Sequence, residues 1–360
     1  MTRLPHIPRT IVFTKLGELS PSKYTVLSNG CAYSFLLQRS LNGLGKPSRL
    51  MPPRSYRNEI GTIIHKVFEL VNSGKLAADR NAIKEFWKGA IIRAEERIME
   101  QYPSLRNLSI SDYNAMFTTI KVASSMAPQT MVASASGRSI VRPNEHDVIL
   151  PGLLKGVIDR IDCASSGTYR IVDYKTGRVF EEDGCIKKDY IDQLNLYAYM
   201  LEEAEHVIVS SLAIIDKDGN SIDVPYYPDR KQVVLREVES LIKSINEAIE
   251  ENNVDSLFSP EEKNCQFCPV FHLCPRRIPL QDSAFKMLEG RISRIWNDDQ
   301  VELTLSDNTI VTITKLRVLE IEEWPSLLGK EAIFVNLLEI TENKLYNRTD
   351  NTVIYIKDRE

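Results

Sequence analysis

Several features that mark whole classes of protein are missing from this 360-residue sequence. No stretch approaches the roughly 18 consecutive apolar residues of a membrane-spanning helix. The first residues, MTRLPH, lack the apolar segment of a secretory signal. We therefore expect a cytoplasmic protein with no membrane association. In that compartment its six cysteines are expected to be thiols or metal ligands rather than disulfides.

A nucleotide-driven motor and a broadly basic surface are also missing. The string nearest to a phosphate-binding loop, "GLGKPS" (43–48), lacks the first glycine of that motif. Net charge is −4, so any contact with nucleic acid must depend on local positive charge. Residues 31–58 offer such charge, because they hold five bases and no acid, and prolines interrupt them, which predicts an irregular basic loop. A DNA contact and a solvated loop both fit this stretch. Its bases are Arg39, Lys46, Arg49, Arg54 and Arg57.

The hydrophobic pattern predicts an α/β domain followed by a small β domain. Helical spacing comes first, most clearly in a buried stripe at Ile60, Ile63, Ile64, Val67, Phe68 and Val71. Short β-like runs then follow, interrupted by one helix and closed by another. The predicted helices are 59–71, 78–101, 111–126, 189–204 and 230–251, and the predicted strands are 147–154, 156–163, 169–175, 207–215 and 221–227.

A second region, residues 281–360, has a different texture. Five β-runs with a helical segment at 318–328 between the third and fourth predict a small OB-like barrel. The domains are therefore expected at 1–280 and 281–360. From Ser283 onward there are 14 acids and 10 bases, which argues against simple phosphate attraction. Trp296, Trp324 and Tyr346 could stack on bases or form the core, and docking of a protein is as well supported as binding of DNA.

A hairpin at 156–177, "GVIDRIDCASSGTYRIVDYKTG", carries the most chemistry. Folding it symmetrically about Ser166 places residue i opposite residue 332 − i, so Asp159 faces Asp173. Opposed residues share one face of the hairpin, and Lys175 projects from that face as well. A register slip of one residue would move Asp159 to the other face, and under another register Asp162 could replace it.

Two carboxylates so close repel each other, and a divalent cation with oxygen ligands relieves that repulsion. A neighbouring ammonium can orient or deprotonate a metal-bound water or neutralise an oxyanion. This combination suits metal-assisted hydrolysis of a phosphodiester. The alternative is a surface hairpin with ordinary charged residues.

Two helices add candidate residues. His65 lies off the apolar stripe of its helix, on the same side as Gly61, where there is room for a ligand or a close backbone. Gln193 and Tyr197 are four residues apart and project together. Taken alone, His65 also fits an ordinary packed histidine, and the other two fit an ordinary amphipathic face.

A cysteine cluster follows the last predicted helix of the first domain. "CQFCPVFHLC" holds Cys265, Cys268 and Cys274, spaced C-x2-C-x5-C, together with His272. Its spacing leaves two possibilities open. One is a zinc site with His272 as the local fourth ligand, and the other is an iron–sulfur site with a distant fourth cysteine.

These motifs occur together and in order, and the set resembles the RecB-like branch of the PD-(D/E)XK nuclease superfamily over about residues 18–280. The matching strings are "GTIIH" (61–65), "GVIDRID" (156–162), "IVDYKTG" (171–177) and "QLNLY" (193–197). "SPSKYTVLSNGCAYSF" (20–35) and the spaced cysteines match the iron–sulfur members, such as the CRISPR-adaptation and AddB-type nucleases. The resemblance implies a mixed central sheet flanked by helices.

The resemblance also implies roles. His65, Asp159, Asp173 and the backbone carbonyl of Tyr174 would bind Mg²⁺ or Mn²⁺, and Lys175 would position or activate water. Gln193 and Tyr197 would support Lys175 and the DNA strand. Cys31 would complete a [4Fe–4S] cluster with Cys265, Cys268 and Cys274, leaving His272 as a packing or surface residue. On this basis Cys31→Ala should bleach and destabilise the protein, and His272→Ala should do neither.

Three functions compete at this point. The first is a metal-dependent deoxyribonuclease, with exonuclease action on single-stranded or unwound ends favoured, acting in repair, recombination or defence beside a separate helicase. The second is a non-catalytic DNA-binding or scaffold subunit of a helicase–nuclease complex, against which the intact catalytic set speaks. The third is a zinc-binding adaptor, which would be colourless where an iron–sulfur protein is brown.

Overall fold

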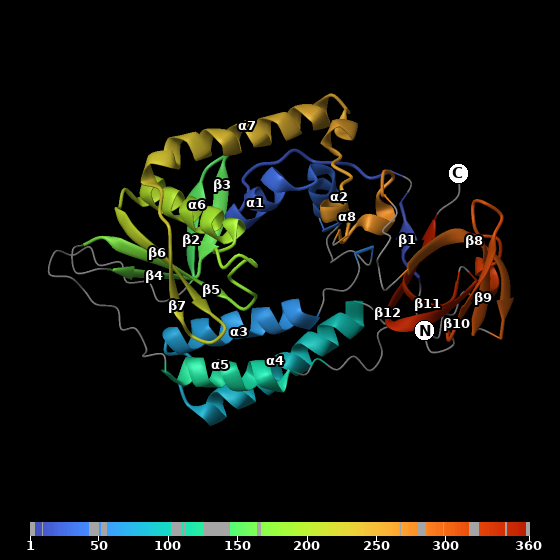
Figure 1. The fold of residues 1–360 in the computed structure, drawn as a ribbon, viewed down its shortest axis with the longest axis horizontal. Helices are drawn as coiled ribbons and strands as arrows, with labels where there is room; N and C mark the ends of the chain where they lie inside the picture. The colour runs from blue at the N-terminus through green and yellow to red at the C-terminus, as the bar shows by residue number, and fades with distance from the viewer. Residues whose placement is uncertain are drawn as a thin grey trace.

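The structure is a computed structural model of the 360-residue chain, and it describes most of it (Figure 1). The described ranges are 4–8, 10–42, 50–51, 56–101, 110, 112–125, 145–163, 167–266, 268–278, 286–297, 299–316, 324–342 and 344–357. No helix within these ranges is long and apolar enough to cross a membrane.

The first region is built on a four-stranded sheet in the order β4-β5-β6-β7, in which only the central β5–β6 pair is parallel. Beside it, β2 and β3 form a two-stranded antiparallel sheet. The strands are β2 (His146–Leu150), β3 (Leu154–Ile158), β4 (Arg160–Cys163), β5 (Tyr169–Lys175), β6 (Val209–Asp216) and β7 (Ser221–Val224).

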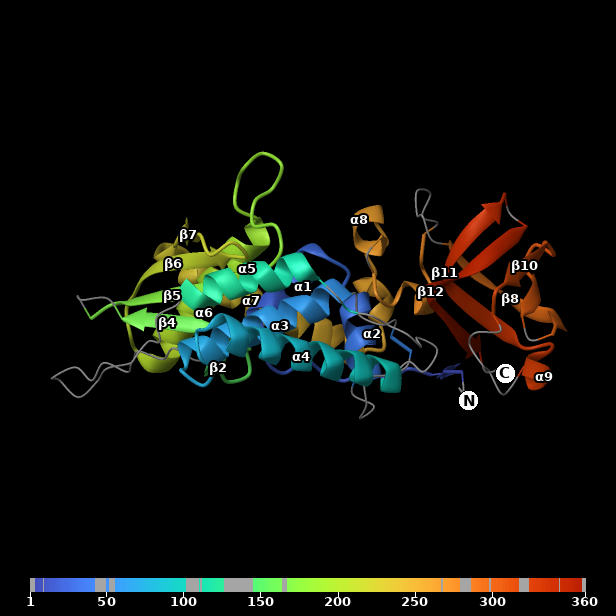
Figure 2. The same ribbon diagram turned by 90° about the horizontal axis from the view of Figure 1, so that it is seen from below.

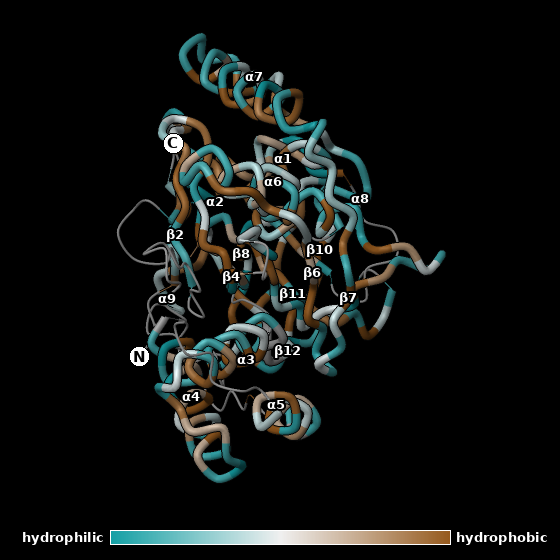
Figure 3. The backbone as a smooth tube through the Cα atoms, turned by 90° about the vertical axis from the view of Figure 1, so that its left-hand side faces the viewer, coloured by the Kyte–Doolittle hydropathy of each residue, from teal (hydrophilic) through white to brown (hydrophobic). Residues whose placement is uncertain are grey.

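Helices cover both faces of the four-stranded sheet (Figure 1). On one face α6 packs with α1 and α7 in a core that includes Ile171 and Leu212; on the other, α3, α4 and α5 surround Tyr174 and Ile215. Figure 3 shows hydrophobic and hydrophilic residues alternating along α7, as expected for a helix that buries one side. The helices are α1 (Pro21–Asn29), α2 (Ala32–Asn42), α3 (Tyr56–Asn72), α4 (Arg80–Gln101), α5 (Tyr113–Ser125), α6 (Lys188–Glu205) and α7 (Lys231–Glu250).

The apolar stripe predicted on α3 is confirmed, since all six of its residues are buried. The prediction of an irregular loop over residues 31–58 is wrong for residues 32–42, which form α2, and for residues 56–58, which begin α3. Helical spacing of Leu37 and Leu41 buries one side of α2, and this pattern outweighs the absence of acids. Arg39 donates to the backbone carbonyl of Lys15 (3.1 Å). The side chains of the other four bases lie outside the described residues.

The C-terminal region is a closed, mixed five-stranded barrel, which lies at one end of the molecule in Figure 2. Its order is β8-β9-β10-β12-β11, closed by pairing of β11 with β8, and β10 runs parallel to β12. The short β1 (His6–Ile7) adds in parallel to the end of β12. The barrel elements are β8 (Lys286–Trp296), β9 (Gln300–Thr304), β10 (Ile310–Thr314), α9 (Trp324–Leu327), β11 (Glu331–Thr341) and β12 (Leu345–Lys357).

Two of the three candidate aromatic platforms belong to the barrel interior. Trp324 is 2% exposed and Tyr346 is 4% exposed, so neither can stack on a base. Trp296 is partly exposed and packs under the guanidinium of Arg294, 4.5 Å from its ring. The predicted helical segment 318–328 is represented by α9, and its first residues lie outside the described part of the chain.

Candidate active site

Strand β5 places Asp173 and Lys175 on its α6 side. Residues 169 and 171 of this strand contribute to the core beneath α6, and alternation gives residues 173 and 175 the same direction. The register predicted for the hairpin is confirmed, because Arg160 pairs with Val172 and Cys163 with Tyr169. In each pair the two residue numbers add up to 332, as symmetry about Ser166 requires.

Asp159 itself lies outside that ladder, at a bend between β3 and β4. The predicted single strand 156–163 is thus two strands, of which β3 pairs with β2 and β4 pairs with β5. At the bend, Asp159 Oδ2 accepts a hydrogen bond from the backbone N–H of Tyr174 (2.9 Å) and lies 3.5 Å from Nδ1 of His65. The bend therefore ties Asp159 to β5 and to helix α3 at once.

Asp162, the alternative partner, is engaged elsewhere. Arg160 donates from Nε and a terminal nitrogen to its two carboxylate oxygens, at 2.7 and 2.9 Å. This bidentate pair turns Asp162 away from a role beside Asp173.

Asp173 is the most buried acid of the set, with 5% of the residue exposed. Burial, which penalises the charged form, raises its pKa from 3.8 to about 6; the Lys175 ammonium opposes this rise and the Asp159 carboxylate adds to it. Lys175 Nζ lies 2.8 Å from Asp173 Oδ2, in an ion pair in which the ammonium donates a hydrogen bond to the carboxylate. The two oxygens of a carboxylate offer about four lone-pair sites, so a further cation can bind Asp173 beside Lys175.

Lys175 is held from helix α6 as well. Its ammonium donates to Oε1 of Gln193 (2.9 Å), and the ring centroid of Tyr190 lies 4.7 Å from Nζ. Its side chain is 15% exposed. The lysine is therefore fixed by three groups while part of it still reaches solvent.

Tyr197 fills the space beside a glycine. A Cβ on Gly156 would lie 2.7 Å from Cε1 of Tyr197 and 3.1 Å from Cδ of Pro21, so no larger residue fits without a shift. Burial raises the pKa of Tyr197 to about 12, and the Asp173 charge contributes to the rise. Its hydroxyl interacts with Gln193 and with the Val157 backbone. At Gly156, strand β3 therefore lies directly against helix α6, through Tyr197, and against helix α1, through Pro21.

On helix α3, His65 faces the carboxylates. Burial works to lower its pKa, but hydrogen bonding to Asp159 and the charges of Asp159 and Asp173 outweigh it, so the pKa is raised. A Cβ on Gly61 would lie 3.1 Å from Oγ1 of Thr176, so the close neighbour of this glycine is a side chain rather than the predicted backbone. Helix α3 can therefore approach the end of β5 closely.

Sequence reasoning missed two residues at the site. Tyr190 touches Lys175 but lies outside the motif strings, and only its position three residues before Gln193 could have indicated it. Glu145 lies near enough to Asp159 and His65 to interact with their charges; burial and the nearby Glu69 raise its pKa.

The four cysteines named for the cluster line one small pocket, walled by aromatic side chains that include Tyr33 and Phe258. These two rings stack 3.9 Å apart between centroids. No disulfide joins any of the six cysteines, all of which lie in the described ranges, and burial raises the pKa of the Cys268 and Cys274 thiols, with the other cluster cysteines adding to the rise. The set from Cys31 and the C-x2-C-x5-C string is thus brought together by the fold.

His272 points away from this pocket. It is 3% exposed, its Nε2 lies 2.8 Å from the carbonyl oxygen of Leu50, and its ring stacks on Tyr355 of β12 at 4.4 Å. Burial lowers its pKa to about 4, so it is neutral at physiological pH. The expectation that His272→Ala leaves stability unchanged must be revised, because the ring packs between the cysteine segment and the barrel.

Within the described residues, no three His, Cys, Asp or Glu side chains lie closely enough to form a ready metal site. The donor types nevertheless fit. Asp159 and Asp173 present carboxylate oxygens of the type that Mg²⁺ and Mn²⁺ prefer, and His65 adds a ring nitrogen beside Asp159. Four thiols in an apolar pocket suit an iron–sulfur cluster.

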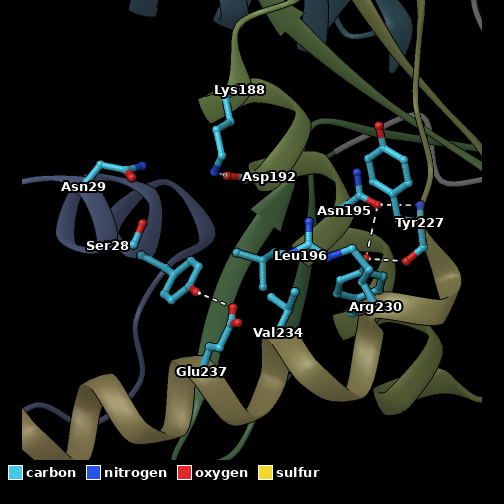
Figure 4. Close-up of a pocket in the computed structure, with 12 residues that line it drawn as sticks. Ser28, Asn29, Lys188, Asp192, Asn195, Leu196, Tyr227, Arg230, Val234 and Glu237 are labelled. Carbon is cyan, nitrogen blue, oxygen red and sulfur yellow. Dashed lines mark hydrogen bonds and ion pairs between the residues drawn. The ribbon is translucent and has the colours of Figure 1, made fainter.

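A separate polar pocket of about 180 Å³ lies against a different side of α6 (Figure 4). Asn195 is buried at its base and accepts from Tyr227 N–H (2.9 Å), and Glu237 accepts from Tyr24 across it (3.5 Å). None of the catalytic candidates lines this pocket. These bonds join α1 to α7 and α6 to the segment that precedes α7.

Comparison with known proteins shows the family to which the chain belongs. Residues 18–275 match the family model described as the PD-(D/E)XK nuclease superfamily. The chain is 31% identical over 171 residues to an ATP-dependent helicase/deoxyribonuclease subunit of Streptococcus equi subsp. zooepidemicus, a match that covers 46% of this chain and 14% of that protein. A solved structure described as "Crystal structure of SSO0001" aligns with 62% of this chain and 97% of its own, at 16% identity and a TM-score of 0.26, too low to inform the fold.

Proposed function

The chain belongs to the PD-(D/E)XK nuclease superfamily, and from this premise we propose that it is a divalent-metal-dependent deoxyribonuclease. It would hydrolyse phosphodiester bonds of DNA, with exonuclease action on single-stranded or unwound ends favoured. The observation that carries the proposal is the position of Lys175, between the buried Asp173 carboxylate and Gln193 of helix α6. An ammonium fixed beside a buried carboxylate is suited to act on water at a metal.

The metal would be held by His65, Asp159, Asp173 and the backbone carbonyl of Tyr174. A bound Mg²⁺ or Mn²⁺ would lower the pKa of the water that it binds and would neutralise part of the phosphate charge. Asp159 is pre-oriented by the N–H of Tyr174, and His65 already faces it. The bend and helix α3 thus bring their donors to the strand that carries Asp173.

Lys175 would position the attacking water or transfer its proton. Gln193 holds the ammonium at its amide oxygen. Tyr197 packs on Gly156 and fixes α6 against β3. With the high pKa of its phenol, Tyr197 stays neutral, and its hydroxyl interacts with Gln193, the side chain that holds Lys175.

We also propose that Cys31, Cys265, Cys268 and Cys274 hold a [4Fe–4S] cluster, supported by their common pocket. Cys31 begins the nuclease region and the other three end it. By analogy with a cross-link over a long loop, joining these ends would contribute on the order of 5 kcal/mol to stability. The iron, sulfide and zinc contents of protein purified without oxygen test this, since a zinc-loaded, colourless protein contradicts it.

For the barrel we propose an OB-like identity, supported by its strand order and its parallel β10–β12 pair. The helicase in the name of the streptococcal relative suggests a separate helicase as partner of this chain. We assign the barrel as the surface that binds this helicase or single-stranded DNA. The process in which the chain would act is DNA repair, recombination or defence.

The test of the enzyme proposal is cleavage of end-labelled single- and double-stranded DNA, blocked or free at each end, with Mg²⁺ or Mn²⁺. Wild type is expected to cut, and Asp173→Asn and Lys175→Met are expected to lose cleavage. Asp223→Asn is the matched control, because this acid on β7 pairs with Arg170 at the surface. Equal cutting by wild type and both site variants would leave the non-catalytic DNA-binding or scaffold subunit as the better account.

A further inference from the structure

One contact of the catalytic lysine belongs to no motif. The ring of Tyr190 lies in the first turn of α6, with its centroid 4.7 Å from Nζ of Lys175. Tyr190 and Gln193 are three residues apart on the helix, so both reach the same ammonium. Tyr190 is half-buried, which places its ring between the protein interior and the opening of the site.

The arrangement surrounds the ammonium from different directions. Asp173 contributes a negative charge at 2.8 Å and Gln193 a carbonyl oxygen at 2.9 Å. The face of an aromatic ring carries partial negative charge and attracts a cation, more strongly where water is partly excluded. Lys175 is mostly buried, so the ring acts on it in such surroundings.

A metal ion changes the balance among these three groups. When the Asp173 carboxylate binds a divalent cation, its attraction for Lys175 falls, because the two cations then share one anion. Gln193 and the Tyr190 ring are not among the proposed metal ligands, so they would keep their attraction for Lys175. The ring thus matters most in the metal-loaded state, when the lysine would otherwise swing away.

The position of Tyr190 is fixed by its surroundings. Its backbone N–H donates to the carbonyl of Lys187 (3.0 Å), and a Cβ on Gly177 would lie 3.6 Å from its hydroxyl. The ammonium of Lys187 also lies over the same ring, at 5.8 Å. One aromatic ring therefore lies close to both the catalytic lysine and a second cation, at the end of the β5–α6 connection.

We propose that Tyr190 is a positioning residue, whose ring face holds the Lys175 ammonium in place for the hydrolysis. This rests on the proposed nuclease function. The phenol hydroxyl is not part of the role, so Tyr190→Phe should keep kcat within about twofold of wild type. Tyr190→Leu should lower kcat by about tenfold with an unchanged KM for DNA, since a cation–π contact of this kind contributes roughly that factor.

Fluorinated side chains at position 190 distinguish a cation–π role of the ring from a purely structural role. Phenylalanines with one, two and three ring fluorines at position 190 keep nearly the same shape but weaken the negative face step by step. A stepwise fall of kcat with fluorination, at constant thermal midpoint, is the expected result. Tyr227→Leu is the matched control, because it removes an exposed tyrosine that lies at the separate polar pocket beside α6.

Each contrary outcome has a distinct meaning. If wild type cuts DNA, Asp173→Asn does not, and the fluorinated series is flat, the Tyr190 inference is overturned and the proposed function stands. A rise in KM with unchanged kcat would overturn it too, and would mark Tyr190 as a base-stacking residue. If wild type does not cut, the function and the inference that rests on it fall together.

Discussion

Replacing Asp173 by asparagine should stabilise the metal-free protein while abolishing cleavage. Burial is the main reason that the Asp173 pKa rises to about 6 from its ordinary 3.8. Keeping this carboxylate ionised in the folded state therefore costs about 3 kcal/mol when the pH is well above 6. Asparagine resembles the protonated acid in size and carries no charge, so this cost disappears in the variant.

The sign of the pH dependence follows from the same shift. The folded state binds the Asp173 proton more tightly than the unfolded state does, so the free energy of unfolding falls as pH rises from about 4 to about 6. Well above about pH 6, the free energy of unfolding no longer changes through the ionisation of Asp173. The advantage of Asp173→Asn should therefore be about 3 kcal/mol near pH 8 and close to zero near pH 4.

The assay is thermal unfolding after brief treatment with EDTA, at several pH values. For a domain of this size each kcal/mol corresponds to roughly 2–4 °C in Tm, so a shift of about 6–12 °C is expected near pH 8. Added Mg²⁺ should raise the Tm of wild type and leave that of the variant unchanged, because the carboxylate that binds the ion is gone. Asp223→Asn again serves as the control for loss of one acid. A metal-free Asp173→Asn protein no more stable than wild type near pH 8, or one whose advantage persists undiminished near pH 4, would refute this reasoning.

Three further outcomes are expected. Gly156→Ala should destabilise by about 1–3 kcal/mol, because the new Cβ would meet the Tyr197 ring at 2.7 Å, whereas Gly17→Ala, with no atom within 4 Å, should be near neutral in denaturant titration. His272→Ala should lower the free energy of unfolding by about 2–4 kcal/mol, because its stacked ring is lost, and should leave the iron content unchanged. A change in iron content with unaltered stability would contradict the packing role. Cys31→Ala should remove the visible absorption and lower Tm, and a variant that keeps full colour would exclude this thiol as a ligand.

Much of the site could be predicted from sequence because its signals are local and periodic. The alternation of β5 gives Asp173 and Lys175 a shared direction, and the symmetric hairpin sets the register of β4 against β5. The bend at Asp159 could not be predicted, because it arises when the chain leaves the ladder with β2 and joins the ladder with β5. That choice depends on pairing partners distant in sequence.

The remaining misses have the same origin. The absence of acids favours a loop over residues 32–42, although the apolar spacing of helix α2 is present in the sequence. Trp324 and Tyr346 can be assigned to the barrel interior only once the strands close around them. The role of Tyr190 depends on the direction of one lysine, which no spacing rule specifies.

The short strand β1 has a consequence for self-association. The end of β12 extends past its partner β10, and that exposed backbone edge would be open to pairing with a strand of another molecule. His6 and Ile7 occupy the edge instead, with Ile356 N–H bonded to the carbonyl of Pro5 (3.0 Å), and Leu4 enters the barrel core. Residues 5–7 thus cover the backbone edge at the end of β12. Fusions or deletions at the amino-terminal side would uncover that edge and favour joining of barrels between molecules, even though the catalytic residues lie in another part of the fold.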